Sequence, residues 1–250
     1  MLARSSDIRR DVFFFPSQGL RLYGSLYAAP GLVRFGAVVS PSIGLEASQS
    51  LDPAHALASA VAELGGAGMV LHPPGSLDSS GDPAELTLDA FTGAVRDAGA
   101  ELRARETVGD LWLIGFRFGA AAAALAAAEL APSVLTMLSP TRDPAAAIGE
   151  LRRDAARATL GRGGATDAFG HTLPPALADA GDGVRIESAM EAAAERLIVV
   201  DFAEPPGRPV PAGAEVLVVP GAMGGFRVRW AAHLARAAEP ALRRRRDVVP

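Results

Sequence analysis

The sequence predicts an α/β protein in which a mostly parallel sheet is covered by helices on both faces. Short apolar segments alternate with helical segments along most of the chain, a pattern typical of parallel strands joined by helical crossovers. The composition is globular, with 49% hydrophobic and 21% charged residues. Because no internal repeat or long linker divides the chain, we predict a single domain over residues 1–250.

The predicted elements begin with an antiparallel hairpin. Its strands are segments 11–16 and 21–28, which join at 17–19, where Gly19 can adopt the turn conformation. Further strands are predicted at 35–40, 68–72, 110–114, 134–138, 196–202 and 215–219. Helices are predicted at 54–64, 84–105, 120–130 and 227–238.

Two parts of the chain depart from this alternation. Between about 140 and 195 the pattern degrades, and we interpret this stretch as a small helical insertion over the strand ends. The arginine-rich end, about 243–250, is predicted to be a disordered, solvated tail.

The composition excludes several chemistries. The chain contains no cysteine and no lysine, so thiol nucleophiles, thiolate metal sites, Schiff bases and a phosphate-binding-loop lysine are ruled out. We expect no cofactor and no metal. The formal net charge of −4 gives no indication of a nucleic-acid partner. No apolar segment reaches the 18 or so residues of a membrane span and no signal peptide is recognisable, so a cytoplasmic protein is expected.

The most informative segment is DLWLIGFRFGAAAAA, residues 110–124. A predicted strand runs into a Gly-x-x-x-Gly turn and then directly into a helix of small residues, which is the architecture of a nucleophile elbow. Gly115 and Gly119 provide the clearance that such a sharp turn requires. The apex, where a hydrolase would place its serine, is occupied by Arg117.

These motifs resemble those of the α/β-hydrolase superfamily, and more narrowly the exosortase A system-associated hydrolases of type 2, which carry an arginine in a GLRxG-type elbow. SPSIGLEASQS resembles the oxyanion loop, PPGSLDSSGDPAE the loop after the next strand, GFRFG the elbow, and VVPGAMGGF the segment that usually offers the catalytic histidine. The resemblance implies an α/β-hydrolase fold and hydrolysis of an ester, thioester or similar acyl substrate.

The chain departs from the superfamily at the residues that perform its chemistry. A guanidinium is always protonated and only donates hydrogen bonds, so Arg117 cannot be a nucleophile. The histidine is absent from residues 220–226, and Asp201, in a plausible acid position, would have no histidine to orient. Two of the three triad members are therefore missing.

Three roles for Arg117 remain open. It can form an internal ion pair with Glu46, or with Asp78, that fixes two loops. It can bind a carboxylate or phosphate together with the free N–H groups at the following helix N-terminus. It can also stabilise an oxyanion directly. The candidate ligand-binding residues are Arg117, Phe118, Ser42, Glu46 and Asp78.

Two histidines are candidates for chemistry. His72 ends a predicted strand at the sheet edge where ligands bind in open α/β folds, and it could activate a displaced serine among Ser40, Ser42 and Ser48. His171 lies in the insertion and could reach over the pocket.

The sequence therefore leaves two hypotheses. The first is a hydrolase with weak or unconventional activity, for which Arg117, His72 and Asp201 are the catalytic candidates. The second is a non-catalytic protein that uses Arg117 and the elbow helix N-terminus to bind a small acidic molecule or a protein partner.

Overall fold

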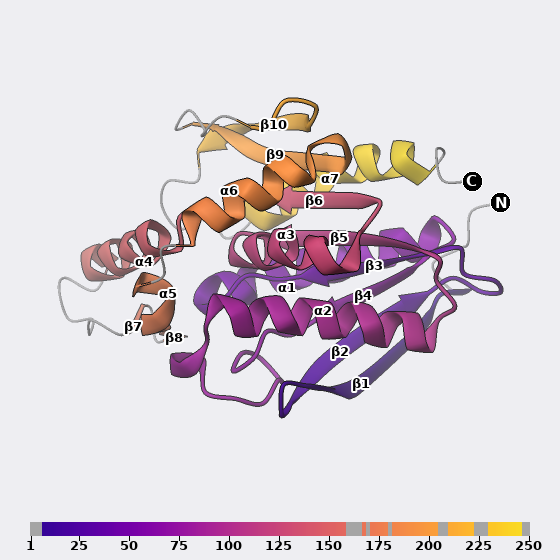
Figure 1. Cartoon of the computed structure of the whole chain (residues 1–250), viewed down its shortest axis with the longest axis horizontal. Coiled ribbons are helices and arrows are strands. Elements are labelled where there is room, and N and C mark those ends of the chain that lie inside the picture. The colour runs from indigo at the N-terminus through magenta and orange to yellow at the C-terminus, as the bar shows by residue number, and fades with distance from the viewer. Residues whose placement is uncertain are drawn as a thin grey trace.

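The computed structural model describes residues 7–158, 167–168, 171–179, 182–204, 210–222 and 230–246. In this part of the chain, eight strands form one mixed sheet in the order β1-β2-β4-β3-β5-β6-β9-β10 (Figure 1). The strands are β1 (Arg9–Ser17), β2 (Leu20–Ala28), β3 (Phe35–Ser40), β4 (Ala67–Leu71), β5 (Asp110–Phe116), β6 (Val134–Leu138), β9 (Leu197–Glu204) and β10 (Glu215–Ala222). The main helices are α1 (Gly44–Glu63), α2 (Leu88–Arg105), α3 (Phe118–Leu130), α4 (Pro144–Ala158), α6 (Gly183–Ala192) and α7 (Trp230–Arg246).

The predicted hairpin is confirmed at the edge of the sheet. β1 pairs antiparallel with β2, and β2 pairs antiparallel with β4, whereas the other neighbouring strands are parallel. The two turn residues have positive φ, 49° for Gln18 and 82° for Gly19. A two-residue turn of this type matches the right-handed twist of the strands that it joins.

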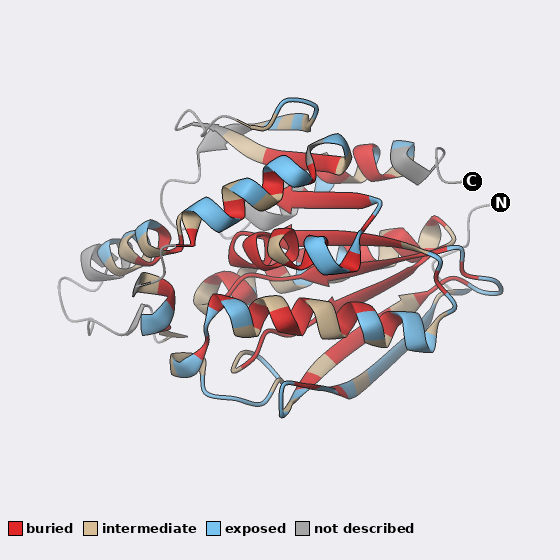
Figure 2. Cartoon of the chain, viewed as in Figure 1, coloured by how far each residue is buried: buried red, intermediate tan, exposed pale blue. Residues whose placement is uncertain are grey.

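Alternate strand residues supply two separate hydrophobic cores, one on each face of the sheet. Leu111 and Leu113 of β5 pack with α2, α3 and α6, while Trp112 and Ile114 pack with α1 and α7. Figure 2 shows the central strands buried along their length. α3 lies between α2 and α6 on its face (Figure 1), which explains why its alanine-rich surface is buried nearly all round.

Two helices start elsewhere than predicted. α1 begins at Gly44 rather than at 54 and continues through Pro53, although proline removes one helix hydrogen bond. Burial of Ala54 and Leu57 against the core outweighs that loss. α2 begins at Leu88 rather than at 84, because the Thr87 hydroxyl accepts a hydrogen bond from the Ala90 N–H and caps the helix.

The structure describes parts of the predicted insertion and of the predicted tail. α6 falls within the segment 140–195, yet it packs on α3 and buries Ile186 and Met190 in the core, so it is part of the helical layer. The tail predicted from about 243 is helical as far as Arg246. Arg243 pairs with Glu239 at 2.6 Å. Residues 247–250 lie outside the described part of the chain. In the described residues, no helix is long and apolar enough to cross a bilayer.

Candidate functional site

The elbow predicted from the sequence is present between β5 and α3. Arg117 has φ 51° and ψ −112°, a backbone conformation that residues other than glycine rarely adopt. Its N–H donates to the Leu138 carbonyl at 3.0 Å, and its carbonyl accepts from the N–H groups of Ala120 at 3.1 Å and Thr141 at 3.2 Å. The apex is therefore held in its strained conformation by the end of β6 and the first turn of α3.

The two elbow glycines allow three backbones to approach closely. A Cβ on Gly115 would lie 2.5 Å from backbone atoms of Ala120. A Cβ on Gly119 would lie 2.2 Å from the Pro41 carbonyl oxygen and 2.5 Å from that of Ser40. The small residues at these two positions thus place the N-terminus of α3 against the end of β3.

Arg117 and Glu46 form the ion pair that was one of the three predicted roles. The Nε of Arg117 lies 3.1 Å from Oε1 of Glu46, and each side chain is only 10% exposed. The Ser42 hydroxyl donates to the other carboxylate oxygen at 2.8 Å. Glu46 lies in the first turn of α1, not in a loop as expected, where the helix dipole also favours its negative charge.

The pair leaves one edge of the guanidinium without a protein partner. Within the described residues, the Nη groups of Arg117 make no hydrogen bond, and Nε is the nitrogen that donates to Glu46. The Phe118 ring is fully buried in the core, so this residue can offer a ligand only its backbone N–H. That N–H is in the first turn of α3 and has no intrahelical acceptor.

His72 lies elsewhere in the structure than the Arg117–Glu46 pair. It follows β4, is 2% exposed, and stacks on the Tyr23 ring with centroids 4.6 Å apart. The Asp78 N–H donates to its Nδ1 at 3.3 Å, and Asp78 Oδ2 also lies 3.3 Å from Nδ1. Asp78 therefore partners His72 rather than Arg117. The Nε2 of His72 is buried and has no hydrogen-bond partner.

Burial lowers the pKa of His72 from 6.5 to about 4, against the opposing influence of Asp78 and with a further lowering by His55. Since the folded state binds the proton more weakly than the unfolded chain, stability is full above pH 6.5 and falls as the pH drops towards 4. A pKa lowered from 6.5 to about 4 corresponds to a loss of about 3 kcal/mol once the pH is below 4. Urea titrations at pH 7, 5.5 and 4.5 should reveal it.

The matched control is His72→Gln, which cannot take up a proton. The wild type should lose more stability than this variant between pH 6.5 and 4. Parallel pH profiles for the two proteins would show that His72 does not carry the effect.

The structure does not assemble a displaced triad in its described part. The serine hydroxyl that bonds to His72 is that of Ser79, and it donates to the backbone carbonyl at 2.7 Å, not to the imidazole. Oδ1 of Asp201 accepts from the N–H of Phe202, and Asp201 contacts neither His72 nor Arg117. In the described residues, no three His, Asp or Glu side chains group as a metal site. The 223–226 part of the VVPGAMGGF segment lies outside them.

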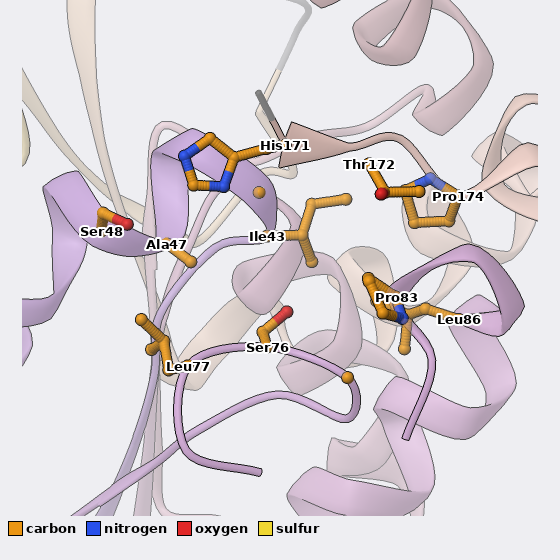
Figure 3. A pocket seen from close by; sticks show the side chains of 12 residues that line it. Ile43, Ala47, Ser48, Ser76, Leu77, Pro83, Leu86, His171, Thr172 and Pro174 are labelled. Atoms are coloured by element: carbon orange, nitrogen blue, oxygen red, sulfur yellow. The ribbon is translucent and has the colours of Figure 1, made fainter. Parts of the chain in front are cut away.

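A cavity of about 220 Å³ lies beside the elbow, between the start of α1, the loop after β4 and strand β8 (His171–Thr172). His171 lines it (Figure 3). Arg117, Glu46, Ser42 and His72 do not. Sequence reasoning missed Ser76, Leu77, Leu86 and Thr172 in its wall. Ser76 and Leu77 could have been identified from their position after β4, at the sheet edge where ligands bind in open α/β folds.

Comparison with known proteins identifies the fold and no more. Neither the models of protein families nor the curated proteins provide a match to the sequence. The structure is similar to hypothetical protein PA2218 from Pseudomonas aeruginosa, with TM-score 0.67, 15% identity, and 98% of this chain and 95% of that one covered. It is also similar to XC6422 from Xanthomonas campestris, described as an α/β serine hydrolase without a lid, with TM-score 0.57, 17% identity and coverages of 96% and 93%.

A third similar structure is Est1E from Butyrivibrio proteoclasticus with bound ferulic acid. Its TM-score is 0.61 and its identity 15%, with 92% of this chain and 98% of that one covered. With the sheet order and the elbow, these similarities show that the chain has the α/β-hydrolase fold, as the sequence predicted. At such low identity they show nothing about its activity.

Proposed function

We propose that this protein is a non-catalytic member of the hydrolase fold that binds a small anionic ligand at its elbow. The observation that carries the proposal is Arg117 at the apex, held by Glu46 through Nε. The guanidinium replaces the nucleophile, and its Nη groups are left to face a ligand.

The loss of catalysis follows from the chemistry of the apex residue. Arginine has no lone pair to attack a carbonyl and no proton to give up at neutral pH. Without nucleophile and base, a hydrolase site retains roughly 10³ to 10⁴-fold acceleration over water, from its remaining contacts. Such a site is a poor enzyme, but its charged and backbone N–H donors can still bind an anion.

Several features favour an anion as the ligand. The Nη edge of Arg117 offers charged donors, and the N-terminus of α3 adds the Phe118 N–H and the positive end of the helix dipole. Glu46 opposes this with its own negative charge, so the affinity should be modest. The ferulic acid bound to Est1E, a carboxylic acid on the same fold, supports this ligand class.

The alternative function is weak or unconventional hydrolysis, with Arg117 as the oxyanion donor. Two observations favour it: the fold similarity to a serine hydrolase, and the resemblance of the GFRFG elbow to that of the exosortase A system-associated hydrolases. We propose that the chain is related to that group through its elbow arginine, whichever activity it has.

The catalytic question has a direct test. A fluorophosphonate probe should not label the protein, and a panel of short-chain esters should show no turnover above that of the Arg117→Gln variant. Reproducible turnover that disappears in Arg117→Gln or His72→Gln would reject the non-catalytic proposal in favour of the alternative.

The anion site is tested by measuring benzoate and phosphate dissociation constants at constant ionic strength. Glu46→Gln should tighten binding several-fold, because it removes the competing negative charge, and Arg117→Gln should abolish it. Each dissociation constant is measured on its own folded variant, which separates binding from stability. If neither anion binds the wild type or Glu46→Gln more tightly than Arg117→Gln, the elbow is not an anion site.

A further inference from the structure

We propose that the cavity beside the elbow is a second binding site, for small uncharged molecules with an apolar body and one or two hydrogen-bonding groups. It is distinct from the anion site proposed above, because Arg117 and Glu46 are absent from its lining. Its ligand class follows from its volume, its walls and its unpartnered polar side chains.

The volume of the cavity limits the size of the ligand. An apolar cavity of about 150 Å³ accommodates benzene. At about 220 Å³, this cavity therefore suits a molecule of about nine non-hydrogen atoms. Substituted phenols, short-chain esters and arylalkyl alcohols are of this size.

The walls combine apolar with polar side chains and contain no carboxylate or guanidinium group. The apolar part of the walls is formed by Ile43, Ala47, Leu77, Pro83, Leu86 and Pro174. Because burying a charge without a partner is costly, such walls favour a neutral ligand over the corresponding acid or amine.

Four polar side chains provide hydrogen bonds that the protein itself does not use. Ser48, Ser76, His171 and Thr172 all line the cavity, and within the described part of the chain none of their side chains makes a hydrogen bond. In Figure 3, the Ser76 hydroxyl and the His171 ring stand on opposite sides of the cavity. A ligand between them can bond to hydroxyls and to an imidazole without first breaking an internal bond.

Leu77, in the wall of the cavity, has a strained backbone conformation. Its φ is 55°, in the left-handed region that is unfavourable for leucine, and its side chain is 41% exposed. This conformation keeps an apolar side chain at the cavity mouth, where a bound ligand would cover it. Strained residues of this kind are concentrated at ligand-binding sites.

The test uses benzyl alcohol, with benzoate and benzylamine as its charged counterparts, titrated into ¹⁵N-labelled wild-type protein. Benzyl alcohol should cause saturable shifts of the amides at residues 43–48, 75–77 and 171–172, with a millimolar dissociation constant. At these amides, the two charged compounds should bind at least several-fold more weakly.

Matched substitutions on one helix locate the site. Ser48→Phe fills the exposed rim of the cavity, whereas Ser59→Phe makes the same change on α1 away from it. The first should weaken benzyl alcohol binding by about tenfold or more and the second should leave it unchanged. Ala47→Leu, which fills the cavity from its wall, should repeat the effect of Ser48→Phe.

Three results would overturn the proposal: no saturable shift at these residues, tighter binding of benzoate than of benzyl alcohol there, or equal binding to Ser48→Phe, Ala47→Leu and Ser59→Phe. Arg117→Gln separates the two sites. It should leave benzyl alcohol binding intact while abolishing the benzoate binding expected at the elbow, so either site can fail alone.

Discussion

Arg117→Ala should lower the free energy of unfolding by about 3 to 5 kcal/mol, the usual cost of breaking a buried ion pair from one side. The substitution leaves the Glu46 carboxylate buried, 10% exposed, with Ser42 as its remaining side-chain partner. Alanine has the same Cβ as arginine, so the strain of the positive φ at the apex does not change. The measurement is urea denaturation at neutral pH.

Two controls distinguish this loss from a general effect of removing arginine. Arg185 forms ion pairs with Asp89 at 2.7 Å and Asp182 at 2.8 Å, but its side chain is 51% exposed. Arg185→Ala should therefore cost less than about 1 kcal/mol. The double variant Arg117→Met/Glu46→Gln should recover much of the loss, because no buried charge remains unpaired. A loss below about 1 kcal/mol for Arg117→Ala would show that the pair is not structural.

Gly119→Ala should destabilise the protein by about 3 kcal/mol or more, because the new methyl group has no space. Its Cβ would lie 2.2 Å from the Pro41 carbonyl oxygen and 2.5 Å from that of Ser40, both on the backbone. Neither can rotate away as a side chain would. α3 would have to move off the end of β3, and the elbow would open with it.

The control is Gly109→Ala, in the turn before β5. A Cβ there meets no atom within 4 Å, so this variant should have nearly the stability of the wild type. Thermal and urea unfolding of the two alanine variants provides the comparison. Equal stability would mean that the close packing at the elbow does not constrain the fold.

Much of the fold was predictable because each strand has a local signal. The segment 35–40 was predicted with its observed ends, and β4, β5 and β6 were located to within two residues. The hairpin turn at Gly19 is equally local. The start of α1 was missed because Ser, Pro and Gly residues around 40–44 are typical of a loop. Only the core on which the helix packs explains its continuation through Pro53.

The candidate site was predictable in part. Elbow spacing placed Arg117 at the apex, and its pairing with Glu46 was one of three open roles. The contact of Asp78 with His72, and the unpartnered Nε2 of that histidine, had no sequence signal. Nor did the cavity, because its lining combines α1, the loop after β4 and β8, which lie far apart in the sequence.

By itself, the sequence determined the fold and the loss of the usual nucleophile. Strand periodicity, glycine spacing and the identity of the apex residue are properties of short segments, and they constrain the chain wherever it packs. The tertiary structure decided which partner Arg117 has, which histidine faces the cavity and which is buried. Those outcomes depend on the distances between segments that lie far apart in the sequence. They also depend on which side chains are buried by the packing. The pairing of one buried guanidinium with one carboxylate at 3.1 Å is a result of that packing.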